Sequence, residues 1–432
     1  MITGDFARLL LALVEIIAVA QVLGLVCRRF GQPAVIGEIT GGILLGPTLF
    51  HGGLTRALFP ADIRPGLTTA ANVGVCVFMF LVGLHLNDSN LRGQGRIALT
   101  VSLGSTAVPF GLGVLLAVGI VGERPGHSAV LFCLFVGTAM SVTAFPVLAR
   151  ILTDRGLIDT PIGDLSLGAA AIGDALAWSS LAMLVAFSHG SGMPWRVLLV
   201  LPFVALLLGV VRPVLTRFAV GRPAARDRGT GVAVGLGVAT VAVLGGALWL
   251  SAQATAWMGL HLIFGSFLLG TALPRSGAAA LRERVLPWVE RINRIVLLPA
   301  FFVVAGLAVN LSTLGAGAPG LFALMLLVAV GGKWAGAFGA ARLGRVPTRH
   351  SAVLAVLLNT RGLTELIVLS VGLQIGLLDQ RLYSLMVLMA LVTTAMAGPL
   401  LSVIYPPWRV ARDRAPRERA LDQPLVGEES TS

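Results

Sequence analysis

The chain has 432 residues, of which 56% are hydrophobic and 12% are charged, and its net charge at pH 7 is +12. Soluble globular domains carry roughly 25% charged residues, so this composition excludes an ordinary soluble domain and indicates a polytopic membrane protein. The positive charge lies at the ends of apolar segments instead of in one basic patch, which argues against nucleic acid as a partner.

Apolar segments follow one another along almost the whole chain. A helix needs about 20 mostly apolar residues to cross a bilayer. We therefore predict an all-α protein with about 13 transmembrane helices and almost no room for a soluble domain. Residues 406–432 are polar and predict a short disordered tail. In chain order the predicted spans are 6–26, 33–50, 67–86, 97–121, 127–152, 160–187, 195–219, 229–249, 254–273, 293–311, 321–341, 350–377 and 381–405.

The basic residues predict how the chain is oriented. If the N-terminus lies outside and the spans alternate, most of the 32 basic residues fall on inside loops and on the C-terminal tail. Cytoplasmic loops carry an excess of arginine and lysine, so we expect an outside N-terminus and a cytoplasmic C-terminus. We expect a multi-pass protein of the plasma (inner) membrane whose first span is not cleaved, with the lipid bilayer as its surroundings.

Two spans differ from the others in carrying polar residues at mid-depth. The segment 127–152 contains Thr138, Ser141 and Thr143 followed by Pro146, and 350–377 contains L-N-T-R-G-L-T-E-L. Both patterns predict helices that are broken within the membrane, which is typical of transporter binding sites. The two spans are seven apart and run in opposite directions, as an inverted repeat of spans 4–6 and 11–13 predicts.

Asp174 and Lys333 lie next to these spans in the sequence, each at the middle of an apolar helix. Lys333 is the only lysine of the chain, and a buried lysine, unlike arginine, can lose its proton. Asp174 offers the hard carboxylate oxygens that suit a proton or a small cation, one at a time. We expect Asp174 to be the proton and cation site, with Na⁺ or K⁺ as a transient metal, and Lys333 to be its charge partner. Each residue also has a purely structural alternative. Asp174 would be a carboxylate hydrogen-bonded to a neighbour, and Lys333 would extend to a membrane interface.

Six further polar residues are expected to support this site: Ser141, Thr143, Asn359, Thr360, Arg361 and Glu365. The first four would present oxygen atoms to an ion. Arg361 and Glu365 are four residues apart, so they form either a purely structural ion pair or a pair that positions the two breaks. Glu15 and Glu38 also lie within spans, but we do not expect them to bind an ion directly.

The sequence lacks the patterns of other membrane functions. It has no G-x-x-x-x-G-K-[ST] phosphate loop, no metal-ligand cluster and no cofactor-attachment site, so we expect neither an enzyme nor a bound cofactor. The alternatives to a cation and proton transporter are an organic-solute transporter on the same inverted-repeat scaffold and a membrane scaffold or sensor that does not transport.

These features together resemble the monovalent cation:proton antiporter-2 family, which includes sodium/proton antiporters, Kef-type potassium efflux proteins and plant cation/proton exchangers. The resemblance covers about residues 10–405 and rests on the following motifs: G-E-I-T-G-G-I-L-L-G-P (37–47), F-L-V-G-L (80–84), A-M-S-V-T-A-F-P-V-L-A-R-I-L (139–152), G-D-A-L-A-W (173–178), Gly332-Lys333 and L-N-T-R-G-L-T-E-L-I-V-L (358–369).

The resemblance implies a homodimer that exchanges Na⁺ or K⁺ for protons by alternating access, within a sodium/hydrogen exchanger-like domain over residues 1–405. A core of spans at about 97–187 and 321–405 would move against dimerisation spans at about 6–86 and 229–311. Asp174 matches the ion-binding aspartate, and Lys333 matches the basic residue opposite it. Gly173 departs from the family pattern, because relatives usually carry Asp, Asn or Gln there. This leaves electroneutral and electrogenic exchange open, and the single carboxylate favours the electroneutral one.

Overall fold

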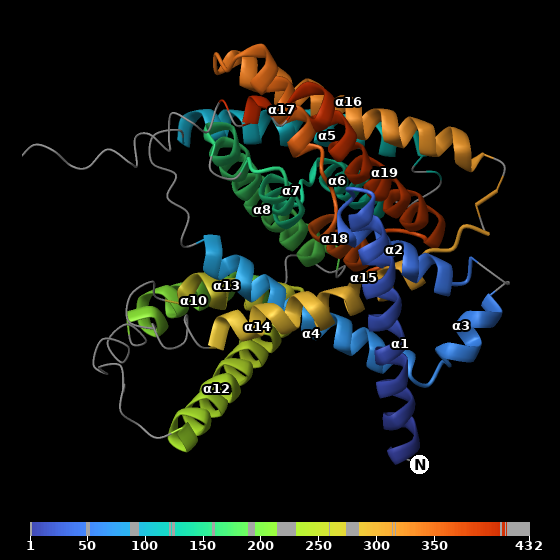
Figure 1. The fold of residues 1–432 in the computed structure, drawn as a ribbon, viewed down its shortest axis with the longest axis vertical. Coiled ribbons are helices and arrows are strands. Elements are labelled where there is room, and N and C mark those ends of the chain that lie inside the picture. The colour runs from blue at the N-terminus through green and yellow to red at the C-terminus, as the bar shows by residue number, and fades with distance from the viewer. Residues whose placement is uncertain are drawn as a thin grey trace, which may run out of the picture.

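In the computed structural model, the regular secondary structure of the described residues is all helical (Figure 1). It describes residues 2–48, 52–86, 95–120, 122, 126–157, 160–188, 195–213, 230–258, 260–273, 285–312, 314–315, 317–406, 408–410 and 412. The predicted tail therefore lies almost wholly outside the described residues. The helices are α1 (Ile2–Arg29), α2 (Ala34–Leu45), α3 (Gly53–Leu58), α4 (Arg64–Leu86), α5 (Gly95–Ile120), α6 (Gly126–Ser141), α7 (Phe145–Asp154), α8 (Pro161–Ser188), α9 (Trp195–Leu198), α10 (Val200–Leu206), α12 (Thr230–Trp257), α13 (Leu262–Ala272), α14 (Leu286–Ile292), α15 (Leu298–Leu307), α16 (Ala318–Leu343), α17 (Thr348–Leu358), α18 (Leu363–Gln374) and α19 (Gln380–Ile404), with π-helical turns η2 (Leu207–Val211) and η4 (Asn293–Leu297).

Most predicted spans coincide with helices to within a few residues. Six single helices are long and apolar enough to cross a bilayer within the described ranges, namely α1, α4, α5, α8, α16 and α19. The pair α17 and α18 passes the same test as one span bent by 41°. The remaining predicted spans correspond to shorter apolar helices, so the number thirteen stays a prediction.

The boundary between the eighth and ninth predicted spans is wrong. It was expected between residues 249 and 254, but α12 continues to Trp257 and α13 begins at Leu262. Two polar residues beyond position 249 are bonded inside the protein. The Ser251 hydroxyl donates to Gly265 O (2.7 Å), and the Thr255 hydroxyl accepts from Gly265 N–H (3.0 Å). Their polar atoms therefore need no water, and the helix continues past them.

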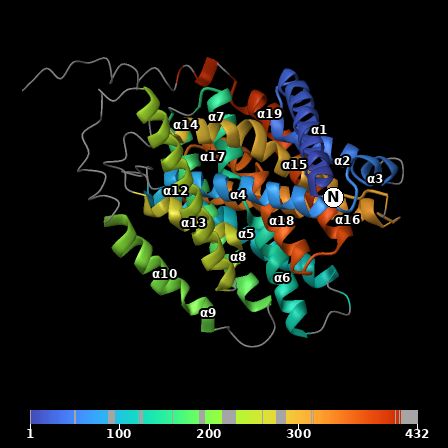
Figure 2. The same cartoon turned by 90° about the horizontal axis from the view of Figure 1, so that it is seen from below.

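The helices form two groups in space. In Figure 1, α5 to α8 and α16 to α19 lie above α1, α4 and α12 to α15, and Figure 2 brings α1, α4, α12 and α13 to the front. Within the first group α5 packs against α16, α6 and α8, while α16 packs against α17 and α19. Within the second group α4 packs against α13 and α15, and α2 packs onto this group through α1 and α15. The first group contains both broken spans.

Glycines allow the closest helix contacts of the fold. A Cβ atom at Gly336 of α16 would lie 2.2 Å from Gly104 O of α5, and one at Gly42 of α2 would lie 2.2 Å from Val303 O of α15. Neither contact leaves room for a side chain, so the backbones touch there. The glycines of α2 thus allow close packing against α1 and α15 of the same chain.

Candidate ion-binding site

The two predicted broken spans are confirmed, and their breaks meet. The first break separates α6 from α7 at residues 142–144, and the second separates α17 from α18 at residues 359–362. Ala144 N–H donates to Thr360 O (3.0 Å), and the Thr143 hydroxyl donates to Leu358 O (2.9 Å). Each break therefore satisfies backbone groups that the other leaves free. This is the condition for non-helical backbone at membrane depth.

Gly362 shows why the second break occurs where it does. Its φ of 155° lies in a region that side chains strongly disfavour, and a Cβ atom there would lie 2.7 Å from Cγ2 of Val147. Both the backbone angle and the neighbouring helix α7 therefore require glycine at this position.

Arg361 is fully buried and binds three acceptors at once. Its guanidinium donates to Ala139 O (3.0 Å) and Met140 O (2.6 Å) of α6 and to Oε1 of Glu365 (2.9 Å). The expected ion pair with Glu365 is present, although Arg361 lies in the break and only Glu365 lies in α18. The arginine thus joins the C-terminal turn of α6 to the start of α18, across the crossing point.

Lys333 of α16 is also fully buried, and its ammonium does not reach an interface. Nζ donates to Ser141 O (2.5 Å) and to the Thr143 hydroxyl (2.6 Å). Ala139, Met140 and Ser141 therefore have carbonyl groups that all accept from a cationic side chain. These are the free carbonyls at the negative end of the α6 dipole, so two buried cations are stabilised there.

Asp174 of α8 faces the opposite helix end. It is 6% exposed, and its Oδ1 has no hydrogen-bond partner. The backbone N–H of Phe145, in the first turn of α7, interacts with this carboxylate. Lys333 interacts with it electrostatically, but the direct bonds of the lysine go to Ser141 and Thr143. A negative group is favourable at a helix N-terminus, so the carboxylate and the lysine occupy complementary ends of one broken span.

The other predicted site residues lie at the same crossing. The Ser141 hydroxyl donates to Thr138 O within α6 (2.8 Å), and the Thr360 hydroxyl, in the second break, donates to Leu357 O near the end of α17 (2.7 Å). Oδ1 of Asn359 and Oε2 of Glu365 are buried without a hydrogen-bond partner. Together with Oδ1 of Asp174, they are acceptors that a cation, a proton or water can satisfy.

Sequence analysis did not identify Thr394 of α19, which holds the second break. Its hydroxyl accepts from Arg361 N–H (3.1 Å) and lies 2.6 Å from Arg361 O. A hydroxyl in an apolar helix is common and usually bonds within its own helix. The only available signal was therefore the Thr393–Thr394 pair near the middle of the last span.

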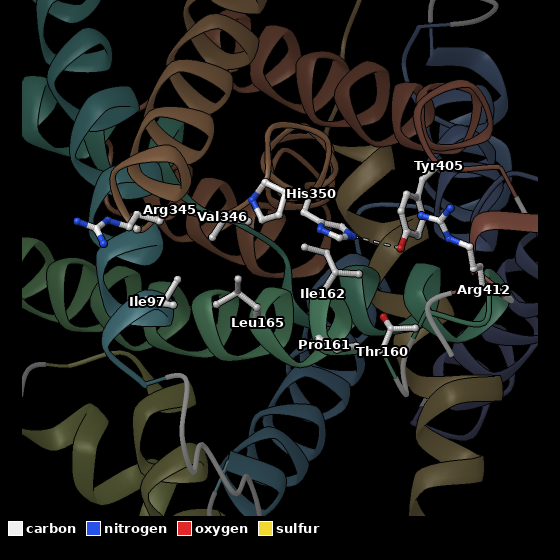
Figure 3. Close-up of a pocket in the computed structure, with 12 residues that line it drawn as sticks. Ile97, Thr160, Pro161, Ile162, Leu165, Arg345, Val346, His350, Tyr405 and Arg412 are labelled. Atoms are coloured by element: carbon white, nitrogen blue, oxygen red, sulfur yellow. Dashed lines mark hydrogen bonds between the residues drawn. The ribbon is translucent and has the colours of Figure 1, made fainter. Parts of the chain in front are cut away.

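A cavity of about 440 Å³ leads toward the crossing from the boundary between the two helix groups. It reaches Val147 and Leu363 beside the two breaks, and its polar lining is Glu38, Arg150, Thr153 and Arg294. Glu38 thus lies on this approach and is not among the residues at the crossing. A separate cavity of about 640 Å³ contains Arg345, His350, Tyr405 and Arg412 in its lining, and none of the predicted site residues. Figure 3 shows His350 and Tyr405 facing each other there.

Comparison with known proteins agrees with this fold. The sequence model described as "Sodium/hydrogen exchanger, transmembrane" matches residues 16–405. The chain is 36% identical over 417 residues to the Na(+)/H(+) antiporter NhaS4 of Synechocystis, covering 94% of this chain and 98% of that protein. It is 35% identical to Cation/H(+) antiporter 20 of Arabidopsis thaliana (94% of this chain, 49% of the relative) and 34% identical to K(+)/H(+) antiporter 1 of Saccharomyces cerevisiae (87% and 44%). It thus spans about half the length of these two relatives.

The structure is similar to that of the sodium proton antiporter MjNhaP1 from Methanocaldococcus jannaschii. The TM-score is 0.63 at 16% sequence identity, and the match covers 95% of this chain and 99% of that one. This likeness supports the fold, and the family match rests on the sequence. The chain therefore belongs to the sodium/hydrogen exchanger family of multi-pass membrane proteins.

Proposed function

We propose that this protein is a secondary active antiporter that exchanges a monovalent cation, Na⁺ or K⁺, for protons, and that both compete for Asp174. The observation that carries the proposal is the buried Asp174 carboxylate, which has an unpartnered oxygen and lies at the N-terminus of α7 near Lys333. Burying such a carboxylate is costly unless a proton, a cation or a counter-charge neutralises it. The relatives named as Na(+)/H(+) and K(+)/H(+) antiporters support the same exchange.

Competition at one carboxylate is enough to couple the two fluxes. A protonated Asp174 is neutral and offers few lone pairs to a cation, whereas a cation on the carboxylate excludes the proton by charge. When neither is bound, Lys333 balances the negative charge of Asp174 electrostatically. Six further residues support this pair in different ways. Thr143, Thr360 and Arg361 join the two broken spans. Ser141 O accepts from Lys333, Glu365 pairs with Arg361, and Asn359 presents an unpartnered oxygen.

Exchange of one cation for one proton, without net charge movement, is the stoichiometry that the contacts of Lys333 favour. The Thr143 hydroxyl donates its own proton to Leu358 O, so it accepts from Nζ, as does Ser141 O. An ammonium that donates to two buried acceptors is stabilised in its charged form. Asp174 would then be the single group that changes protonation during the cycle.

Alternating access would move one helix group against the other. The group with both breaks, within about 97–187 and 321–405, would form the transporting core. Helices within about 6–86 and 229–311 would form the dimerisation part of a homodimer. The cavity lined by Glu38, Arg150 and Arg294 lies between these parts and would admit cations from one side. The charge distribution supports an outside N-terminus and a cytoplasmic C-terminus in the plasma (inner) membrane.

The experiment is cation-induced proton release from proteoliposomes, with Na⁺ and K⁺ tested separately. Asp174→Asn should abolish release, because an amide can neither titrate nor supply a charge to a cation. Asp164→Asn is the matched control on the same helix, in its first turn, and it should retain exchange. Full exchange by Asp174→Asn would refute the assignment.

A further inference from the structure

We propose that Ser102 and Thr106 of α5 supply neutral oxygen ligands to the cation, in the space beside Gly173, and so complete a site of which Asp174 is the charged half. This inference rests on the proposed function, because it adds ligands to the same site. It also explains the absence of a side chain at position 173.

Gly173 is not a close-packing glycine. A Cβ atom added there would meet only Oγ of Ser102 at 3.6 Å and Oγ1 of Thr106 at 3.8 Å, which are ordinary contact distances. At Gly336, in contrast, a Cβ atom would lie 2.2 Å from a backbone oxygen. Helix packing therefore requires glycine at 336 and not at 173. The volume that a side chain at 173 would fill faces two hydroxyl groups instead.

Ser102 has an unused polar atom in this space. The residue is 0% exposed, and its Oγ has no hydrogen-bond partner. Several other buried hydroxyls among the described residues bond to a carbonyl of their own helix, as Ser166 does to Ile162 O (2.6 Å) and Ser105 does to Ser102 O (3.0 Å). A buried polar atom without a partner is costly and indicates a bound ion or water.

The neighbouring residue carries the second unused atom. Asp174 directly follows Gly173 on α8, and its Oδ1 is also buried without a partner. One carboxylate oxygen and two hydroxyl oxygens from adjacent helices are hard, mostly neutral ligands that can replace part of the hydration shell of a monovalent cation. The loaded site would carry one negative and one positive charge, which agrees with one-for-one exchange.

The two competitors need these hydroxyls to different extents. A proton binds the Asp174 carboxylate by a covalent bond and needs no further ligand. A cation needs several oxygens at once, so it loses affinity when the hydroxyls are removed. Ser102 and Thr106 should therefore determine cation affinity and selectivity, and they should leave the step that moves the loaded core unaffected.

The test compares half-saturating Na⁺ and K⁺ concentrations in proteoliposomes for the wild type and three variants. The double variant Ser102→Ala/Thr106→Val should raise the half-saturating concentration of the transported cation about tenfold or more, with a maximal rate close to wild type. Gly173→Ala should act in the same direction, because its methyl group would occupy the ligand space. It should not lower thermal stability, since alanine fits there and favours a helix. Ser105→Ala is the matched control on α5, with an expected change below about twofold.

The outcomes separate this inference from the proposed function. Unchanged half-saturation and unchanged Na⁺/K⁺ selectivity in both the double variant and Gly173→Ala would overturn the ligand assignment, even if Asp174→Asn is inactive. An equal effect of Ser105→Ala would also overturn it, because the effect would then come from the packing of α5. The inference is supported if the half-saturating cation concentration rises in both the double variant and Gly173→Ala but not in Ser105→Ala.

Discussion

Replacement of Arg361 by methionine should destabilise the protein far more than neutralisation of its partner Glu365. Arg361 makes three buried hydrogen bonds, two of them to the C-terminal carbonyls of α6. Arg361→Met removes all three and leaves the Glu365 carboxylate buried without its hydrogen-bonded arginine. Breaking a buried ion pair from one side costs about 3–5 kcal/mol, because the remaining charge is uncompensated.

Glu365→Gln is a milder change of the same pair. The new amide oxygen still accepts from Arg361, and the bonds to Ala139 O and Met140 O remain. The variant exchanges one charge-assisted hydrogen bond for a neutral one, a difference of about 1 kcal/mol. The expected order of stability is therefore wild type, then Glu365→Gln, then Arg361→Met. A double variant, Arg361→Met/Glu365→Leu, should recover part of the loss, because no unpaired charge remains.

The assay is thermal unfolding of the purified protein in detergent, combined with cation-induced proton release. If the pair is structural, Glu365→Gln should retain exchange at close to the wild-type rate. Equal destabilisation by Arg361→Met and Glu365→Gln would refute the reasoning, because it would mean that the α6 carbonyls contribute nothing. Loss of exchange in a stable Glu365→Gln protein would instead place Glu365 at the ion site.

Three further variants test other contacts. In Lys333→Arg, the guanidinium cannot place a single donor between Ser141 O and the Thr143 hydroxyl, and it cannot lose its proton. The variant should therefore exchange more slowly, and any residual exchange should be insensitive to membrane potential. A wild-type rate and a wild-type pH profile would reject a role for lysine itself. Gly173→Asp adds a second carboxylate next to Asp174, so more than one proton should move per cation. Exchange should then become sensitive to a clamped membrane potential. Exchange that does not depend on the potential would count against the single-carboxylate stoichiometry. Gly362→Ala should lower stability by about 1–3 kcal/mol, because a Cβ atom strains a φ of 155° and meets Val147; an unchanged melting temperature would contradict that geometry.

Hydropathy and the position of polar residues predicted most of the helices and both breaks. Long apolar helices have few alternatives in a bilayer, so α1, α5 and α16 follow directly from composition. Asn359 to Glu365 signalled the second break because so many polar atoms cannot remain on an intact, lipid-facing helix. The end of α12 was not predictable in this way, because Ser251 and Thr255 use their hydroxyls on α13, a tertiary contact that no local pattern shows.

The hydrogen-bond partners of the buried charged residues were still harder to predict from sequence, because they depend on tertiary structure. The sequence placed Lys333 opposite Asp174, but its direct acceptors, Ser141 O and the Thr143 hydroxyl, become available only where α6 ends. A carbonyl group is present at every residue, so no residue type marks the one that a lysine will contact. Ser102 was overlooked for a similar reason, since a serine in a membrane helix usually bonds to its own backbone.

The two helix ends that meet at the first break, the C-terminus of α6 and the N-terminus of α7, have opposite roles, and this limits where a cation can bind. The negative end of α6 is already neutralised, because Arg361 and Lys333 occupy the carbonyls of Ala139, Met140 and Ser141. Those oxygens are not free to hold a transported ion, and a third positive charge there would be repelled. The positive end of α7 faces Asp174, where a carboxylate is stabilised even when it is empty. This asymmetry favours the proposed ion site on the α7 side, between α8 and a helix that offers uncharged oxygens, and α5 with Ser102 and Thr106 is such a neighbour.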